Sequence, residues 1–214
     1  MRNVLSQDKL FFGGVGLLSL AVLSLGLIIF SGDTSNTIST PESLVKKDSQ
    51  VKGAADAKVV VVEFADFQCP ACRAAYPITK KLVADYKDKI KFVYRHFPLT
   101  DAHEYALQAA EAAEAAGEQG KFWEYHDLLF ENQENLAEDD LINYAKQLNL
   151  DVGKFREVLD SGKYKDKVLA DLADGQKAGV NSTPTFFING KKYAGVLDSE
   201  KFRGILDGEL RSTK

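Results

Sequence analysis

The chain has 214 residues, of which 45% are hydrophobic and 27% are charged, and its formal net charge is -4 at pH 7. This length and balance are typical of one globular domain with an additional segment. The charge is mild, and no basic run or basic–aromatic pattern occurs, so nucleic-acid binding is set aside and no nucleic-acid partner is expected.

An apolar segment lies close to the N-terminus. Arg2 and Lys9 precede it, and residues 10–30 contain no charged side chain, which is long enough for a membrane-spanning helix of about 20 residues. The segment ends without an Ala-x-Ala pattern, and no cysteine directly follows it, so we expect an uncleaved transmembrane signal anchor, with a cleaved signal peptide as the alternative. No Lys or Arg follows until Lys46, so the positive-inside rule places residues 1–9 in the cytoplasm and the remainder outside.

The next segment is polar. Residues 31–56 are rich in Ser, Thr, Asp, Lys and Gly and contain one proline. This composition predicts a flexible tether, followed by a folded domain at 57–214.

A Cys-x-x-Cys motif stands where a predicted strand meets a predicted helix. The strand, residues 59–64, consists of four valines, Glu63 and a phenylalanine, which is typical of a buried strand. Pro70 suits the first position of a helix, so Cys69 is expected at the N-cap and Cys72 in the first turn. Unpaired backbone N–H groups and the helix dipole stabilise an anion there, so the Cys69 thiol should have a lowered pKa.

The chemistry of the two cysteines allows three interpretations. A thiolate with a second thiol one helical turn away is suited to thiol–disulfide exchange. A zinc site needs two more ligands at suitable spacing, and the three histidines, His96, His103 and His126, form no such pair. A purely structural disulfide would close too short a loop to remove much entropy from the unfolded chain. We therefore favour redox chemistry carried by the cysteines themselves, with no bound cofactor or metal.

The remaining elements predict two β-containing halves separated by helices. A helix from 69 to about 86 and a strand at 91–97 complete a βαβ unit with a parallel strand pair. Helices are then expected at 103–116, 121–132, 139–148, 151–159 and 163–177, which places a helical insertion at about 101–178. Strands at 185–188 and 192–196 flank the hairpin signal Asn189-Gly190, and a last helix, capped by Ser199, runs to about 210.

This order resembles the thioredoxin fold, and the insertion is similar to that of the DsbA family of extracytoplasmic thiol–disulfide oxidoreductases, in its membrane-anchored form. The resemblance covers residues 55–212 and is carried by the strand leading into Cys69-Pro70-Ala71-Cys72, the aromatic stretch 120–130, and the stretch 179–190 with its Thr-Pro. The expected fold is α/β: a thioredoxin fold, βαβ then ββα, with an inserted helical subdomain and one preceding transmembrane helix.

The resemblance implies roles for five residues. Cys69 would be the nucleophile, and Cys72 would resolve the mixed disulfide. Thr183 and Pro184 match the family's cis-proline, which would expose the Thr183 backbone to a substrate peptide; an ordinary trans-proline is the alternative. Glu63 matches the buried acid of the first strand, whose raised pKa would let it exchange a proton with Cys72 through water; a salt-bridged or edge-facing glutamate is the alternative.

The motif also departs from the family pattern. The strongest oxidants of the family have a histidine between the cysteines, where this chain has Pro70-Ala71. The resemblance implies an enzyme that donates a disulfide to thiol-containing secreted or membrane proteins and is re-oxidised by a quinone-linked partner in the cytoplasmic membrane. Its catalytic domain would lie on the extracytoplasmic side. A reductase or isomerase of the same fold is one alternative, and a non-catalytic peptide-binding chaperone module is another.

Overall fold

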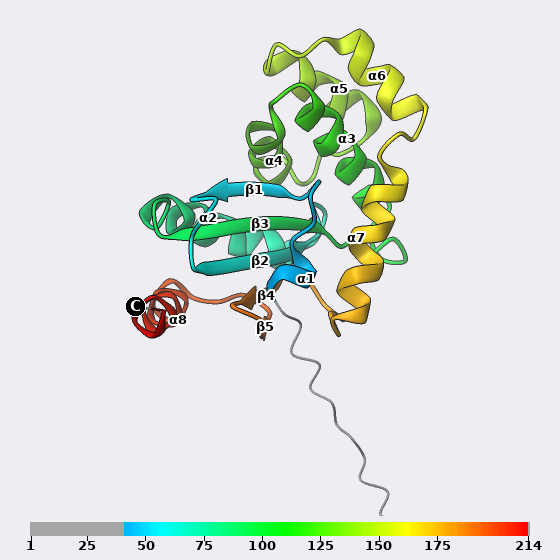
Figure 1. Cartoon of the computed structure of the whole chain (residues 1–214). Coiled ribbons are helices and arrows are strands. Elements are labelled where there is room, and N and C mark those ends of the chain that lie inside the picture. Colours follow the sequence, from blue (N-terminus) through cyan, green and yellow to red (C-terminus); the bar gives the residue numbers. More distant parts are fainter. Residues whose placement is uncertain (1–40, 214) are drawn as a thin grey trace, which may run out of the picture. The chain divides into compact units, whose positions relative to one another are not determined.

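The computed structural model describes residues 41–213, whose centre is a five-stranded mixed sheet (Figure 1). The strand order is β1-β3-β2-β4-β5, in which β2 and β3 are parallel and every other neighbouring pair is antiparallel. The strands are β1 (Gln50–Gly53), β2 (Val59–Ala65), β3 (Ile90–His96), β4 (Thr185–Ile188) and β5 (Lys191–Ala194). This is the predicted thioredoxin-like arrangement, with one additional strand at its edge.

The helices divide into those that cover the sheet and those that form the insertion. Three helices come from the two β-containing halves: α1 (Pro41–Leu44), α2 (Pro70–Asp85) and α8 (Ser199–Ser212). The helices between β3 and β4 are α3 (Ala106–Glu118), α4 (Phe122–Glu131), α5 (Glu138–Gln147), α6 (Val152–Asp160) and α7 (Lys165–Lys177). The predicted helical insertion is therefore confirmed. The cap of α8 is Asp198 rather than the predicted Ser199, because the Asp198 carboxylate accepts from the Lys201 N–H.

The predicted cytoplasmic N-terminus, residues 1–9, and the predicted anchor, residues 10–30, lie outside the described residues. Within residues 41–213, none of the helices has the length and apolar character needed to cross a membrane.

Strand β2 provides apolar side chains to both faces of the sheet, as the run of valines predicts. Val59 and Val61 pack in one cluster with residues of α2 and α8. Val62 and Phe64 pack in another cluster on the opposite face, with Leu44 of α1 and with α7 alongside. The motif therefore follows a strand that is fixed from both sides.

Part of the predicted tether is folded, so that prediction is wrong for residues 41–53. Strand β1 pairs antiparallel with β3, with Gln50 opposite Tyr94. The carbonyl oxygen of Leu44 accepts a hydrogen bond from Nη1 of Arg95 at 2.7 Å. A polar sequence is sufficient for β1 because it is an edge strand whose residues are exposed or only partly buried.

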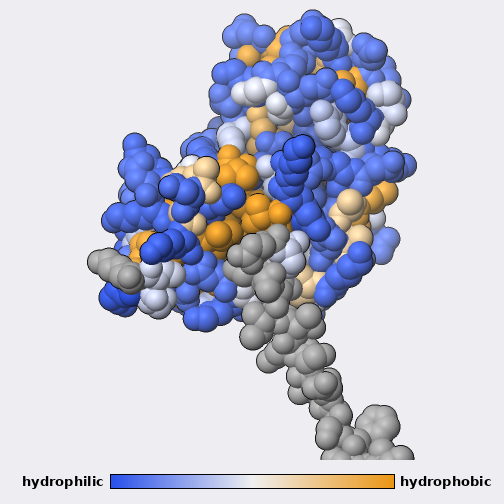
Figure 2. All heavy atoms as spheres, viewed as in Figure 1, coloured by the Kyte–Doolittle hydropathy of each residue, from blue (hydrophilic) through white to orange (hydrophobic). Residues whose placement is uncertain are grey.

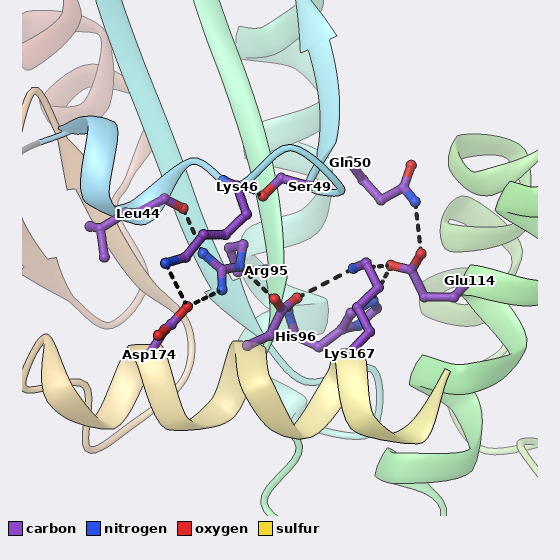
Figure 3. Close-up of polar contacts among 10 residues, drawn as sticks. Leu44, Lys46, Ser49, Gln50, Arg95, His96, Glu114, Lys167 and Asp174 are labelled. Atoms are coloured by element: carbon purple, nitrogen blue, oxygen red, sulfur yellow. Dashed lines mark hydrogen bonds and ion pairs between the residues drawn. The ribbon is translucent and has the colours of Figure 1, made fainter. Parts of the chain in front are cut away.

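A buried polar network joins this N-terminal segment to the insertion (Figure 3). Arg95, which is fully buried, pairs through Nε with Asp171 at 2.7 Å and through Nη2 with Asp174 at 2.9 Å. Farther along α7, Nζ of Lys167 lies 2.7 Å from Oε1 of Glu114 on α3. Because buried charges are costly unless paired, these contacts fix α3 and α7 against β3.

The polarity of the surface differs between the insertion helices and the sheet (Figure 2). On the visible face the helices of the insertion present mostly hydrophilic residues, whereas hydrophobic residues gather near β1 and β3. The insertion helices are therefore amphipathic, with their apolar sides turned inward.

Candidate active site

The Cys-x-x-Cys motif begins α2 in the predicted manner. Cys69 is the N-cap residue, with extended backbone angles of φ -76° and ψ 121°, and Pro70 occupies the first turn. The Cys69 side chain makes no capping hydrogen bond, and the helix begins with backbone N–H groups that have no partner within the helix. The sequence thus places a thiol at the positive end of a helix dipole.

The Cys69 thiol is strongly acidic in this setting. A hydrogen bond from the Cys72 thiol is the main cause that lowers the pKa of Cys69 to about 5. Burial opposes this shift, while Thr183 and the backbone N–H groups of Ala71 and Cys72 support it. Both cysteines are free thiols, and that of Cys69 is 7% exposed. Cys69 is therefore a thiolate at neutral pH in the dithiol form.

Cys72 has the opposite properties. It is 1% exposed, and its sulfur accepts a hydrogen bond from the backbone N–H of Asp66 at 3.5 Å. Burial, and then the hydrogen bond and negative charge of Cys69, raise the pKa of Cys72 well above its ordinary value. The pair therefore divides into a slightly exposed thiolate, Cys69, and a fully buried neutral thiol, Cys72.

The Thr183–Pro184 segment lies against the motif immediately before β4. Its peptide bond is cis, as predicted, which excludes the trans alternative. The Cys69 sulfur lies 3.5 Å from the carbonyl oxygen of Thr183, to which the protonated thiol donates. The Thr183 hydroxyl is buried and has no hydrogen-bond partner within residues 41–213, so it remains available to a thiolate at Cys69.

Glu63 lies on the central strand β2, between Tyr94 of β3 and Phe186 of β4 in the register. It is 4% exposed and forms no ion pair with any described residue, so the salt-bridged and edge-facing alternatives are wrong. Burial raises the pKa of the Glu63 carboxyl from 4.5 to about 8, as predicted. Glu63 is therefore a buried acid that carries a proton at neutral pH.

A small cavity of about 30 Å³ borders Glu63. Thr79, His126 and Asp127 also line it, and the buried Thr79 hydroxyl has no partner among the described residues. A water molecule needs roughly 10–15 Å³ and two or more polar partners. The cavity meets both conditions, so water can join the Glu63 carboxyl to the groups that line it.

His126 serves packing, as expected from the apolar pattern around it. Its ring lies 4.9 Å from that of Tyr94 in a T-shaped arrangement and 5.3 Å from that of Trp123. Burial lowers the pKa of His126, so the ring is neutral.

Asp66 is a site residue that the sequence analysis missed. Its buried carboxylate accepts hydrogen bonds from the backbone N–H groups of Gln68 at 2.7 Å and Leu99 at 2.8 Å, and from Nδ1 of His103 at 2.7 Å. Asp66 therefore holds the motif and the loop after β3 together. A charged residue at the end of an apolar strand, three positions before Cys69, was the signal available in the sequence.

Gln133, after α4, is the second missed residue. Its Nε2 donates to the carbonyl oxygens of Phe67 at 2.8 Å and Cys69 at 2.9 Å. It therefore fixes the backbone of the motif from the side of the insertion. No local pattern around Gln133 indicates this contact, because it depends on packing between distant segments.

No group of three or more His, Cys, Asp or Glu residues within 41–213 could hold a metal ion.

Comparisons with known proteins agree with this fold and site. A family model described as thioredoxin matches residues 46–208. The chain is 47% identical over 164 residues to an Na(+)/H(+) antiporter NhaA 3 of Salinispora tropica, covering 77% of this chain and 25% of that protein. It is 37% identical to an NhaA antiporter of Herminiimonas arsenicoxydans, covering 77% and 26%. The chain thus spans about a quarter of these relatives.

Solved structures share the whole domain. A thioredoxin-like oxidoreductase from Silicibacter pomeroyi is 27% identical, with a TM-score of 0.72, covering 79% of this chain and 97% of that one. BdbD from Bacillus subtilis is 28% identical, with a TM-score of 0.69, covering 76% and 93%. The thiol-disulfide exchange protein alpha-DsbA2 from Wolbachia pipientis, at 21% identity and a TM-score of 0.73, covers 81% and 94% and shares the fold.

The described residues combine a thioredoxin-like fold with two free cysteines at the start of α2. The family match extends over most of the described residues. The chain belongs to the thioredoxin family.

Proposed function

We propose that this chain donates the Cys69–Cys72 disulfide to thiol-containing secreted or membrane proteins outside the cytoplasm. The observation that carries the proposal is the asymmetry of the pair: the Cys69 pKa is lowered to about 5 while that of Cys72 is raised. A stabilised thiolate favours the dithiol form, and a disulfide whose reduced form is stabilised is readily given away. This supports an oxidising role even though Pro70-Ala71 replaces the histidine of the strongest oxidants.

The transfer takes two steps. A client thiolate attacks the sulfur of Cys69, the Cys69–Cys72 bond breaks, and Cys72 leaves with the bonding electron pair and takes a proton from Glu63. A second client thiolate then attacks the client sulfur of the mixed disulfide, and Cys69 leaves as a thiolate. The client loses two electrons, which the cysteine pair keeps, so no bound cofactor is needed.

The remaining site residues support these steps. Glu63 is protonated at neutral pH and borders the small cavity, so water there would replace a proton that Glu63 gives to Cys72. Thr183 and Pro184 would present backbone groups beside the Cys69 sulfur, where a client segment could pair with them as an added strand.

The proposed location is the extracytoplasmic side of the cytoplasmic membrane. It rests on the uncharged stretch 10–30 and on the positive charges of Arg2 and Lys9 before it. A quinone-linked membrane partner would accept the electrons. A membrane-impermeant thiol reagent should label Cys69 in cells with an intact cytoplasmic membrane, and failure to label it until that membrane is broken would contradict this location.

Disulfide transfer is tested by mixing the oxidised 214-residue chain with a reduced client protein that forms one disulfide when native. We expect the client to gain its disulfide as the chain gains two thiols, and we expect no transfer by Cys69→Ser. In cells, Cys72→Ser should accumulate the mixed disulfides that form when the Cys69 thiolate attacks a client disulfide, because Cys72 is then absent and cannot attack Cys69 to release the client. If Cys69→Ser keeps the full cellular role, the chain is a non-catalytic binding module instead.

A further inference from the structure

His103 is held in one orientation at the edge of the motif. Its Nδ1 lies 2.7 Å from Oδ2 of Asp66, whose carboxylate is fully buried and also accepts from the backbone N–H of Leu99. A carboxylate oxygen accepts, so Nδ1 carries a proton, and the tautomer with its one proton on Nδ1 has its lone pair on Nε2. The side chain is 18% exposed, so the ring is held at Nδ1 and still reaches the surface.

His103 lines a pocket of about 220 Å³. The residues on either side of Cys69, Gln68 and Pro70, line the same pocket, together with Gln133 and Glu134. The pocket therefore lies directly beside the reactive Cys69, where the residues that flank a client cysteine would be close to it.

The pocket offers hydrogen-bond acceptors. The amide nitrogen of Gln133 already serves the carbonyl groups of Phe67 and Cys69, which leaves its Oε1 for another partner. Glu134 is 80% exposed, and its Oε1 pairs with Arg73 at 2.9 Å, which leaves its second oxygen. With Nε2 of His103, these are three acceptors, beside the amide nitrogen of Gln68, whose Oε1 already accepts from the backbone N–H of Tyr105; no Lys or Arg side chain lines the pocket.

We propose that this pocket binds a basic side chain next to the reactive cysteine of the client, with Nε2 of His103 as a hydrogen-bond acceptor. Asp66 acts as the positioning residue that holds the ring. A lysine or arginine side chain supplies the donors and the positive charge that these acceptors lack. This inference rests on the proposed function, since it assigns the client preference of the same site.

The test compares two dithiol peptides that differ only beside one cysteine, where one carries lysine and the other norleucine. We expect the oxidised wild-type chain to oxidise the lysine peptide with a kcat/KM about threefold higher than that for the norleucine peptide. This ratio corresponds to the free energy of one partly exposed polar contact. The chain's net charge of -4 also favours a cationic peptide. The wild-type ratio alone therefore does not test the pocket, and the ratio measured in His103 variants does.

Two substitutions of His103 separate the pocket contact from the fold. His103→Asn places an amide nitrogen where Nδ1 lies and keeps the Asp66 bond, but it removes Nε2; the formal charge does not change. His103→Gln reaches the place of Nε2 with its amide. We expect His103→Asn to lower the peptide ratio toward about one, with dithiothreitol oxidation and the reduction potential unchanged, and His103→Gln to retain more of the preference.

The outcomes distinguish this inference from the proposed function. An unchanged peptide ratio in His103→Asn overturns the inference, as does an equal loss of dithiothreitol oxidation, which would mark a purely structural role. If the wild-type chain oxidises neither dithiothreitol nor peptide, the proposed function fails. The same peptide ratio is then expected in the reduction of the corresponding peptide disulfides, and its absence there overturns the inference.

Discussion

The thiol of Cys69 lies 3.5 Å from the carbonyl oxygen of Thr183, a residue 114 positions away in the chain. The contact brings the start of α2 together with the segment before β4, one from each β-containing half of the fold. The reactive sulfur is therefore bordered by backbone on one side and by the helix terminus on the other. This arrangement lowers the pKa of one thiol and leaves it next to backbone groups that can align a client.

The reduced chain should lose stability on acidification because of Cys69. Its pKa is about 5 in the folded chain, against an ordinary value of 9.0, so the unfolded chain binds more protons between these values. The contribution of Cys69 to the free energy of unfolding is complete above about pH 9, falls with pH, and is lost below about pH 5. The oxidised chain has no thiol there, so the excess stability of the reduced form should shrink over this range.

Denaturant unfolding of both redox forms at a series of pH values measures this difference. The raised pKa of Cys72 does not change this stability difference below about pH 9, because a raised pKa affects stability only above the ordinary value of 9.0. Glu63 is present in both redox forms, so its contribution to the free energy of unfolding largely cancels in the difference between them. A reduced-minus-oxidised difference that stays constant from pH 9 to about pH 5 would contradict the acidity assigned to Cys69.

Glu63→Gln should stabilise the chain at alkaline pH and slow its chemistry. The folded pKa of about 8 lies above the ordinary 4.5, so the wild-type chain loses stability as pH rises between these values. A neutral glutamine has no such loss, and the variant should be more stable at pH 8 by on the order of 4 kcal/mol, with little difference at pH 4. Single-turnover client oxidation should fall by roughly a hundredfold if Glu63 supplies the proton.

The two readouts test different statements about Glu63. Unfolding curves that keep the wild-type pH dependence in Glu63→Gln would show that the carboxyl is not buried as described. A stabilised variant with unchanged oxidation rate would show that Cys72 receives its proton from another source.

Gly175 of α7 should not tolerate even a methyl group. A Cβ there would lie 2.7 Å from Cδ2 of Phe97 and 3.0 Å from Cδ1 of Phe64. Gly175→Ala should therefore destabilise the chain by about 1–3 kcal/mol, despite the better helix propensity of alanine. The matched control is Gly204→Ala in α8, where nothing lies within 4 Å, and it should stabilise by about 0.5–1 kcal/mol. Thermal unfolding of both variants checks this prediction, and shifts in melting temperature of the same sign in the two variants would contradict it.

Local chemistry explains what could be predicted from the sequence. The position of Pro70 predicts the N-cap at Cys69, and the residue pair Asn189-Gly190 predicts a hairpin in which both residues have positive φ, as they do at 46° and 81°. The valine run predicts a central strand, and with it the burial of Glu63. Each of these depends on residues adjacent in the chain.

The missed features depend on partners far away in the chain. Strand β1 has a polar sequence and forms because β3 offers a free edge. Asp66 and Gln133 acquire their roles from Leu99, His103 and the carbonyl groups of the motif. Periodicity does not reveal such contacts, since it reports burial and not which polar groups meet.

The reduction potential of the Cys69–Cys72 pair tests the central claim most directly. The purified chain is equilibrated in glutathione buffers of defined poise, the thiols are trapped under acid, and the fraction reduced is counted. The stabilised Cys69 thiolate predicts a value more oxidising than about -200 mV, in the range of disulfide donors. A value near or below about -270 mV, in the range of thioredoxin-like reductants, would contradict the oxidising role and make the chain a reductase.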